Sequence, residues 1–285
     1  MPLTELARLL NAHADNPYAG ERFANPFVAT GRGVDVVFAD LRLRSHFLSI
    51  VDTADGRQHG HAAALSVAGL TCGRTLDPAS VFVFPANDSE FVYLDRLVRT
   101  LHALNYLTQR VRGNLLLKVH QRHVLSVPAD HGLAFEELLR GCGLLPEQVT
   151  LEIDGEGIDD VEHLKRAVAN YKARGYGIAI ARFGHASIDF ALLEALAPDI
   201  VKLAPALLGS SRPLPRLIAR LHDLGARVMI EGIDTRALRR GAAENGIDLL
   251  QSVGAPYRVG EPAPLPLAGD DAANAPAHAL RAASG

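Results

Sequence analysis

Four polar side chains in this sequence close apolar runs of the kind that form buried strands. They are Glu152 in Leu-Glu-Ile, Lys202 in Ile-Val-Lys-Leu, Glu231 after Val-Met-Ile and Gln251 after Asp-Leu-Leu. One such residue is costly to bury without a partner and is usually solvated at a rim. Four of them at equivalent strand ends favour one shared pocket. Its carboxylates could hold a divalent metal, whereas its cations could bind a phosphate directly.

The strands that must position these residues alternate with helical patterns. Apolar runs predict strands at 46–51, 62–67, 115–119, 149–153, 177–181, 200–203 and 227–230. Helix patterns lie at 91–110, from Asp159 or Asp160 to Gly175, from Pro213 to Gly225, and from Asp234 to Gly246. Such alternation predicts a parallel sheet covered on both faces. We therefore expect an α/β fold, a TIM-like (β/α) barrel with its functional groups at the C-terminal ends of the strands.

The two ends of the chain differ in composition from the middle. Residues 1–40 hold one apolar helical pattern followed by a Gly/Pro/Asn-rich stretch. Residues 41–266 carry the alternating pattern, and we assign them to the barrel. Residues 267–285 are rich in Ala and Pro without a sustained apolar period, which predicts a disordered tail.

The composition argues against several classes of function. The 285 residues have a formal net charge of -3 and a pI near 6.5. They lack the excess of basic residues that is typical of proteins that bind a nucleic-acid polymer. No apolar run reaches the roughly 18 residues that a membrane span needs, and no basic segment precedes an apolar core as in a secretory signal. Cys72 and Cys142 lie in unrelated surroundings, so we expect reduced thiols and a cytoplasmic location.

Several blocks in the middle of the chain match one known set of motifs. Residues 175–184, Gly-Tyr-Gly-Ile-Ala-Ile-Ala-Arg-Phe-Gly, resemble G-x-x-x-A-[IL]-D-D-F-G, and 190–204 keep the spacing of L-x-x-L-x-x-D-x-[IV]-K-I-D. Residues 228–235 are similar to V-x-A-E-G-V-E-T, and 49–56 to Q-P-I-V-D-x-x-x-G. Together the blocks resemble the EAL domain family, whose members hydrolyse cyclic di-GMP with divalent metals. The resemblance implies a barrel of the EAL type, and a homodimer is one expectation because the family often dimerises.

The departures from this pattern fall on the positions that the family uses for chemistry. Its metal ligands correspond here to Ala62, Lys118, Ala181 and Arg182, and its ligand-contacting glutamine and arginine to Leu48 and Ser66. Magnesium or manganese needs several hard oxygen ligands and tolerates no cation among them. Two unit charges about 4 Å apart repel by about 4 kcal/mol at an effective dielectric constant of about 20.

We therefore expect that the magnesium or manganese site is lost, that no cofactor is bound and that the chain is not an enzyme. Our hypothesis is that Lys118, Arg182 or Lys202 takes the place of the metal charge. At least one of them should then pair with Glu152 or Glu231, because an unpaired buried carboxylate is expensive.

Three functions remain open at this point. The first is an inactive regulatory module that binds a partner protein, with 1–40 and 68–87 as candidate surfaces. The second is a metal-independent cyclic di-GMP receptor, in which Lys118, Arg182 and Lys202 contact the phosphates against Glu152 and Glu231. The third, a minor alternative, is an active cyclic di-GMP phosphodiesterase.

Overall fold

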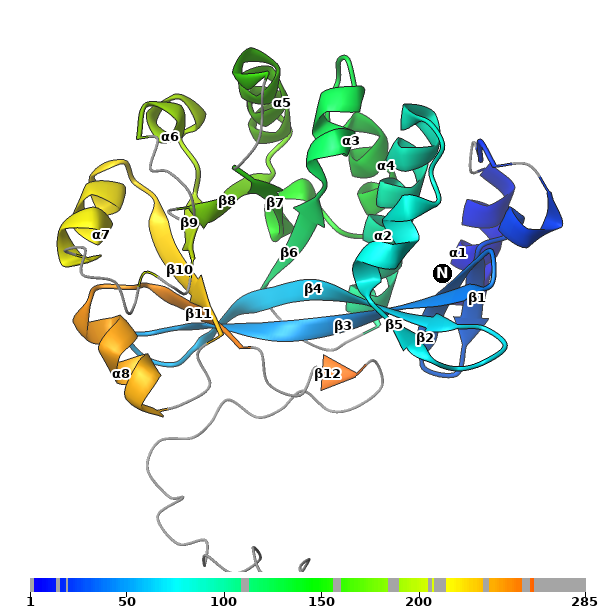
Figure 1. Ribbon diagram of the computed structural model, residues 1–285, viewed down its shortest axis with the longest axis horizontal. Coiled ribbons are helices and arrows are strands. Elements are labelled where there is room, and N and C mark those ends of the chain that lie inside the picture. Colours follow the sequence, from blue (N-terminus) through cyan, green and yellow to red (C-terminus); the bar gives the residue numbers. More distant parts are fainter. Residues whose placement is uncertain are drawn as a thin grey trace, which may run out of the picture.

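Eight strands close into a barrel with helices on its outside in the computed structural model of the protein (Figure 1). The structure describes residues 3–13, 16–18, 20–108, 113–155, 160–183, 190–204, 207, 214–232, 236–252 and 257–258. The predicted α/β, TIM-like barrel is confirmed. The segment 267–285, expected to be a tail, lies outside the described residues.

The eight barrel strands comprise seven at the predicted apolar runs, most of them longer than predicted, and one at 249–251 that was not predicted as a strand. They are β3 (Leu41–Asp52), β4 (Gln58–Gly69), β6 (Asn114–Val119), β7 (Val149–Asp154), β8 (Gly177–Phe183), β9 (Ile200–Leu203), β10 (Arg227–Glu231) and β11 (Leu249–Gln251). Their order is β3-β11-β10-β9-β8-β7-β6-β4, and β4 pairs with β3 to close the ring. The strand β3 is antiparallel to both neighbours, whereas the other barrel pairs are parallel.

The helices that separate the parallel strands include the four that were predicted and three that were not. They are α2 (Asp88–Leu107), α3 (Gln121–Ser126), α4 (Leu133–Cys142), α5 (Val161–Ala173), α6 (Phe190–Leu196), α7 (Leu214–Asp223) and α8 (Arg236–Glu244). Asp160 caps α5, because its carboxylate accepts a hydrogen bond from the backbone N–H of His163 at 2.8 Å. Pro213 and Asp234, the expected starts of α7 and α8, lie outside the described residues.

The first 40 residues contain two strands besides the predicted helix. After α1 (Leu3–His13) and η1 (Glu21–Phe23), β1 (Phe27–Thr30) pairs with β2 (Gly33–Phe38), and β2 pairs with β3. The sheet therefore extends beyond the barrel, joined on β4 by β5 (Thr75–Leu76), which η2 (Pro78–Val83) follows, and on β3 by β12 (Tyr257–Arg258). A second apolar core, with Phe38, Leu43 and Leu94 at its centre, joins this extension to α1 and α2. The segment 1–40 is thus continuous with the barrel sheet.

An apolar layer fills the lower part of the barrel lumen. It consists of Ile50, Ala62, Leu116, Ala179, Ile200, Met229 and Leu249, one residue from each of seven strands. Side chains two residues apart on a strand point to the same face. The next inward-facing residue on each strand must therefore lie directly above this layer, at the mouth of the barrel.

Candidate functional site at the barrel mouth

The second layer of the lumen contains most of the polar residues singled out in the sequence. Two residues beyond the apolar layer stand Lys118 on β6, Ala181 on β8, Lys202 on β9, Glu231 on β10 and Gln251 on β11. On β7, Glu152 stands beside Lys118 in the strand register. The predicted convergence of polar strand ends on one place is therefore observed.

The centre of this layer is the ammonium group of Lys202. Its Nζ lies 3.1 Å from Oε2 of Glu152 and 2.8 Å from Oε2 of Glu231. The side chain of Lys202 is only 7% exposed, that of Glu152 12% and that of Glu231 40%. Burial alone would lower the pKa of Lys202, but the two carboxylates outweigh it and the pKa lies above its ordinary value. The hypothesis that a cation pairs with these glutamates is confirmed for Lys202.

Gln251 adds an unusual feature to the mouth. Its side chain is buried, and its Oε1 atom has no hydrogen-bond partner among the residues that the structure describes. A buried amide oxygen without a donor is costly. A donor that reached this buried atom would therefore gain a hydrogen bond with an unsatisfied acceptor.

The other two cations do not reach the glutamates. Nε of Arg182 lies 2.8 Å from Oδ2 of Asp154, and the Arg182 backbone adopts a left-handed φ of 55° at a bulge where β8 meets β9. Lys118 is exposed and forms no ion pair with the described residues. Asp154 was missed in the sequence, although it lies two residues after Glu152 and period-two alternation puts it on the same face.

The remaining positions singled out by the resemblance present no metal ligand. Ala62 and Ala181 are buried methyl groups, and Leu48 packs against the apolar layer. Ser66 lies further along β4, where it pairs with Arg44 of β3.

The described residues fit a metal centre poorly. None of their His, Cys, Asp and Glu side chains form a group of three that could hold an ion. The mouth offers the carboxylates of Glu152 and Glu231 and the amide of Gln251, and both carboxylates already contact Lys202. A hard divalent cation takes about six oxygen ligands.

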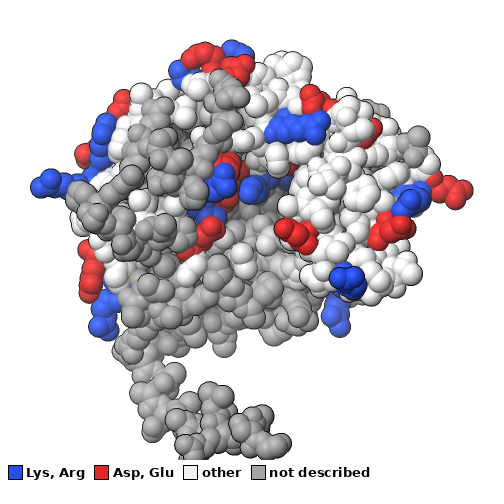
Figure 2. All heavy atoms as spheres, viewed as in Figure 1, with Lys and Arg blue, Asp and Glu red and all other residues white. Residues whose placement is uncertain are grey.

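Two further observations concern the surface charge and the helices. On the face shown in Figure 2, basic and acidic side chains are interspersed rather than gathered by sign. Within the described part of the chain, no helix combines the length and the apolar character needed to cross a bilayer.

Comparison with known proteins places this geometry in context. The model of the EAL domain family matches residues 37–251. The uncharacterized EAL-domain containing protein YkuI of Bacillus subtilis is 30% identical over 130 residues, which are 41% of this chain and 31% of YkuI. The chain therefore matches less than a third of the length of this curated relative.

Solved structures with cyclic di-GMP share the fold. Bacillus subtilis YkuI with cyclic di-GMP and calcium superposes with a TM-score of 0.65 and 19% identity, covering 76% of this chain and 56% of YkuI. Klebsiella pneumoniae BlrP1 with manganese and cyclic di-GMP gives 0.65 and 20%, covering 75% and 55%. A standalone EAL protein of Vibrio cholerae O395, bound to cyclic di-GMP, gives 0.62 and 20%, covering 76% and 93%.

Proposed function

The chain belongs to the EAL domain family, and from this premise we propose that it is a catalytically inactive regulatory module of cyclic di-GMP signalling that acts by binding a partner protein. The observation that carries the proposal is the lack of acidic ligands in the lumen, where Ala62 and Ala181 are buried methyl groups and Glu152 and Glu231 already pair with Lys202, a lysine that the family motif retains. Hydrolysis of a phosphodiester by two metals needs several acidic ligands to hold the ions about 3.5–4 Å apart. With so few ligands, we propose that neither magnesium nor manganese binds.

The partner surface that we propose lies in the segment 68–87, one of the two candidate segments named from the sequence. At the end of η2, Val83 is 79% exposed and Phe84 41% exposed. Two adjacent large apolar side chains on the surface suit a protein contact better than they suit solvent.

The interaction is tested by capture of proteins from the native host on the immobilised chain. Val83→Asp should abolish retention of a specific protein that the wild-type chain retains in stoichiometric amount. Leu145→Asp, which changes another exposed apolar residue, 47% exposed and shortly before β7, should leave retention unchanged. Equal retention by all three chains would remove η2 from the interface.

A metal-independent receptor for cyclic di-GMP is the second candidate, favoured by the unpartnered Oε1 of Gln251. A guanine N–H could donate to this atom. The charge at the mouth argues against it, because Asp154 joins Glu152 and Glu231, so that three acids now match Lys118, Arg182 and Lys202.

Calorimetry with cyclic di-GMP, with magnesium and with a chelator, separates the candidates. The proposal predicts no heat of binding under either condition. Micromolar binding that ignores the chelator, and that weakens in Gln251→Leu, would establish the receptor. Release of linear pGpG would establish the enzyme.

A further inference from the structure

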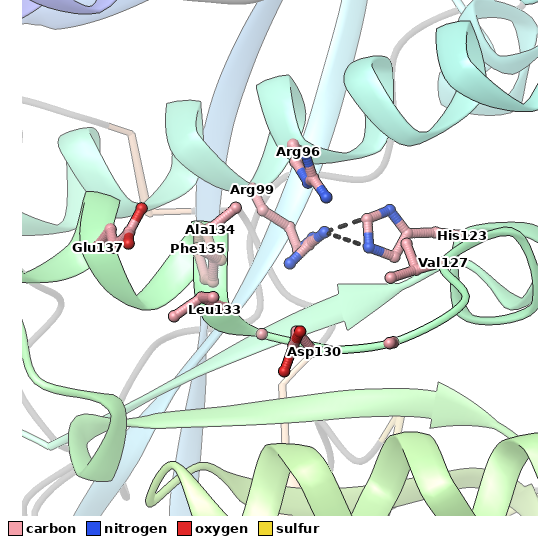
Figure 3. Close-up of a pocket in the computed structure, with 11 residues that line it drawn as sticks. Arg96, Arg99, His123, Val127, Asp130, Leu133, Ala134, Phe135 and Glu137 are labelled. Atoms are coloured by element: carbon pink, nitrogen blue, oxygen red, sulfur yellow. Dashed lines mark hydrogen bonds between the residues drawn. The ribbon is translucent and has the colours of Figure 1, made fainter.

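A second polar cavity, of about 230 Å³, opens on the outside of the barrel between α2, α3 and α4 (Figure 3). Arg96 and Arg99 enter it from α2, His123 from α3, and the first turn of α4 forms the opposite wall. Water occupies about 30 Å³ per molecule in the liquid. The cavity thus has room for a small ion and part of a molecule that carries it.

Arg99 is held rigidly at the base of this cavity. Its side chain is 2% exposed, its Nη2 lies 2.9 Å from Oδ2 of Asp95, and its Nε donates to the same oxygen at 3.0 Å. Nη2 also lies 3.2 Å from Nε2 of His123, and the guanidinium stacks over the ring of Phe135. The Arg99 charge is therefore balanced internally by Asp95 and fixed in direction.

Arg96 carries a charge that is not balanced in this way. It lies on the same face of α2, one turn before Arg99, and is half-buried. Among the described residues, no carboxylate lies within ion-pair distance of its guanidinium group. Burial, together with the neighbouring charge of Arg99, lowers the pKa of Arg96, and the opposing influence of Tyr171 and Asp95 does not offset this.

The first turn of α4 presents further positive potential to the same space. Its N-cap is Gly132, with a left-handed φ of 86° and no side chain to accept from the first amides. Gly132, Leu133 and Ala134 all line the cavity. The amides of an uncapped helix start carry partial positive charge and favour an anion.

Two acids also line the cavity, and both lie at its solvent side. The side chain of Asp130 is 76% exposed, and its Oδ1 forms an ion pair with Nη2 of Arg174 at 3.7 Å. Glu137 is exposed as well. Solvent screens both carboxylates, whereas Arg99 is buried and Arg96 half-buried in the same cavity. The neutral imidazole of His123, whose pKa burial and Arg99 keep well below its usual value, adds no charge.

We propose that this cavity binds a small oxyanion, a phosphate or carboxylate group of a metabolite, between Arg96, Arg99 and the N-terminus of α4. The anion supplies the counter-charge that Arg96 lacks and accepts from the amides of Ala134 and Phe135, since the amide of Leu133 already donates to the carbonyl of Asp130 at 3.1 Å. This site is separate from the barrel mouth, and it does not depend on whether the chain binds cyclic di-GMP.

The test follows thermal unfolding during titration with inorganic phosphate and, in a second arm, with acetate, each at constant ionic strength against sodium chloride. We expect a saturable rise in the unfolding temperature of the wild-type chain. Loss of a charge-assisted hydrogen bond should weaken binding about tenfold or more in Arg96→Gln. Arg216→Gln, an exposed arginine on α7, should bind as the wild type does. A larger response to phosphate than to acetate would identify a phosphate group as the preferred oxyanion, and the reverse would identify a carboxylate group.

A second variant keeps the test independent of folding defects. Ala134→Asp places a carboxylate in the first turn of α4, where it should raise the unfolding temperature of the free protein and weaken phosphate binding by competition. An oxyanion response that is absent from the wild type in both arms, or unchanged in both Arg96→Gln and Ala134→Asp, would overturn the proposal.

Discussion

Two groups of buried charge in this protein are built from similar parts and differ in how completely they are closed. Behind α2, the carboxylate of Asp95 accepts from Arg99, from the amide of His120 at 3.3 Å and lies 3.1 Å from Nδ1 of His123, with almost no exposure. At the barrel mouth, Lys202 contacts two glutamates, yet Glu231 is 40% exposed.

The mouth also contains an unsatisfied hydrogen-bond acceptor, because Oε1 of Gln251 has no partner among the described residues. A closed network of charges fixes the packing of helices, since removing one member strands the others. An open one, at the C-terminal ends of barrel strands, is placed where a ligand or a partner can complete it. The comparison therefore assigns stability to the first group and recognition to the second.

Breaking the closed network around Asp95 and Arg99 should have the largest effect on the free energy of unfolding. Burial raises the pKa of Asp95, so its charge depends on the donors around it, and Asp95→Ala leaves Arg99 buried without a counter-charge. We expect a loss of about 4–5 kcal/mol in the free energy of unfolding, measured by urea denaturation. The double variant Asp95→Leu/Arg99→Met should recover most of this loss. A single variant within about 1 kcal/mol of the wild type would contradict the role of this network.

Removing the ammonium group of Lys202 should lower the free energy of unfolding by a smaller amount. Lys202→Met strands Glu152, but water reaches the site past Glu231, so we expect a loss of about 3 kcal/mol at pH 7. The pKa of Lys202 is raised in the folded protein. Its contribution is therefore complete below the unfolded pKa of about 10.4 and disappears as the pH rises through the folded value. Denaturation curves between neutral and alkaline pH should show this decline in the wild type and lack it in the variant.

The imidazole of His102 is a buried neutral group, and it extends the comparison to acidic pH. Burial lowers the pKa of His102 to about 3, and its Nδ1 lies 2.9 Å from Oγ of Ser45. Its neutral form favours folding above the unfolded pKa of about 6.5, and this advantage is lost as the pH falls toward the folded value. The wild type should lose up to about 1.4 kcal/mol per pH unit more than His102→Gln below pH 6 or so. Parallel pH profiles would contradict the burial of a neutral imidazole.

The smallest effect is expected at the exposed side of the mouth. Glu231→Gln keeps the Lys202–Glu152 contact and changes a group that solvent already reaches, so the free energy of unfolding should fall by less than about 1 kcal/mol. A loss as large as that of Lys202→Met would show that the mouth is as closed as the network behind α2.

The difference between these regions also explains which features of the structure could be predicted from the sequence. Buried parallel strands carry their own signal, so the barrel, and the convergence of Glu152, Lys202, Glu231 and Gln251, were predictable from apolar runs and the alternation of faces. The strands of 1–40 were missed because their apolar runs are short and flanked by Pro and Gly, although β1 pairs with the neighbouring β2 and β2 with β3.

Contacts between helices were less accessible to sequence reasoning. The cavity beside Arg96 depends on how α2, α3 and α4 pack together, and no spacing within one helix encodes that arrangement. The pairing of Arg182 with Asp154 depended on the local bulge of β8, which turns Arg182 away from the mouth glutamates.

The central claim is that Glu152 and Glu231, paired with Lys202 and without acidic side chains at Ala62 and Ala181, hold no divalent metal. Titration of manganese into the intact chain, followed by electron paramagnetic resonance of the free ion, tests it most directly. We predict that all added manganese stays free up to millimolar concentration, in the wild type and in Glu231→Gln alike. One or two tightly held ions per chain, released by Glu231→Gln, would contradict this account.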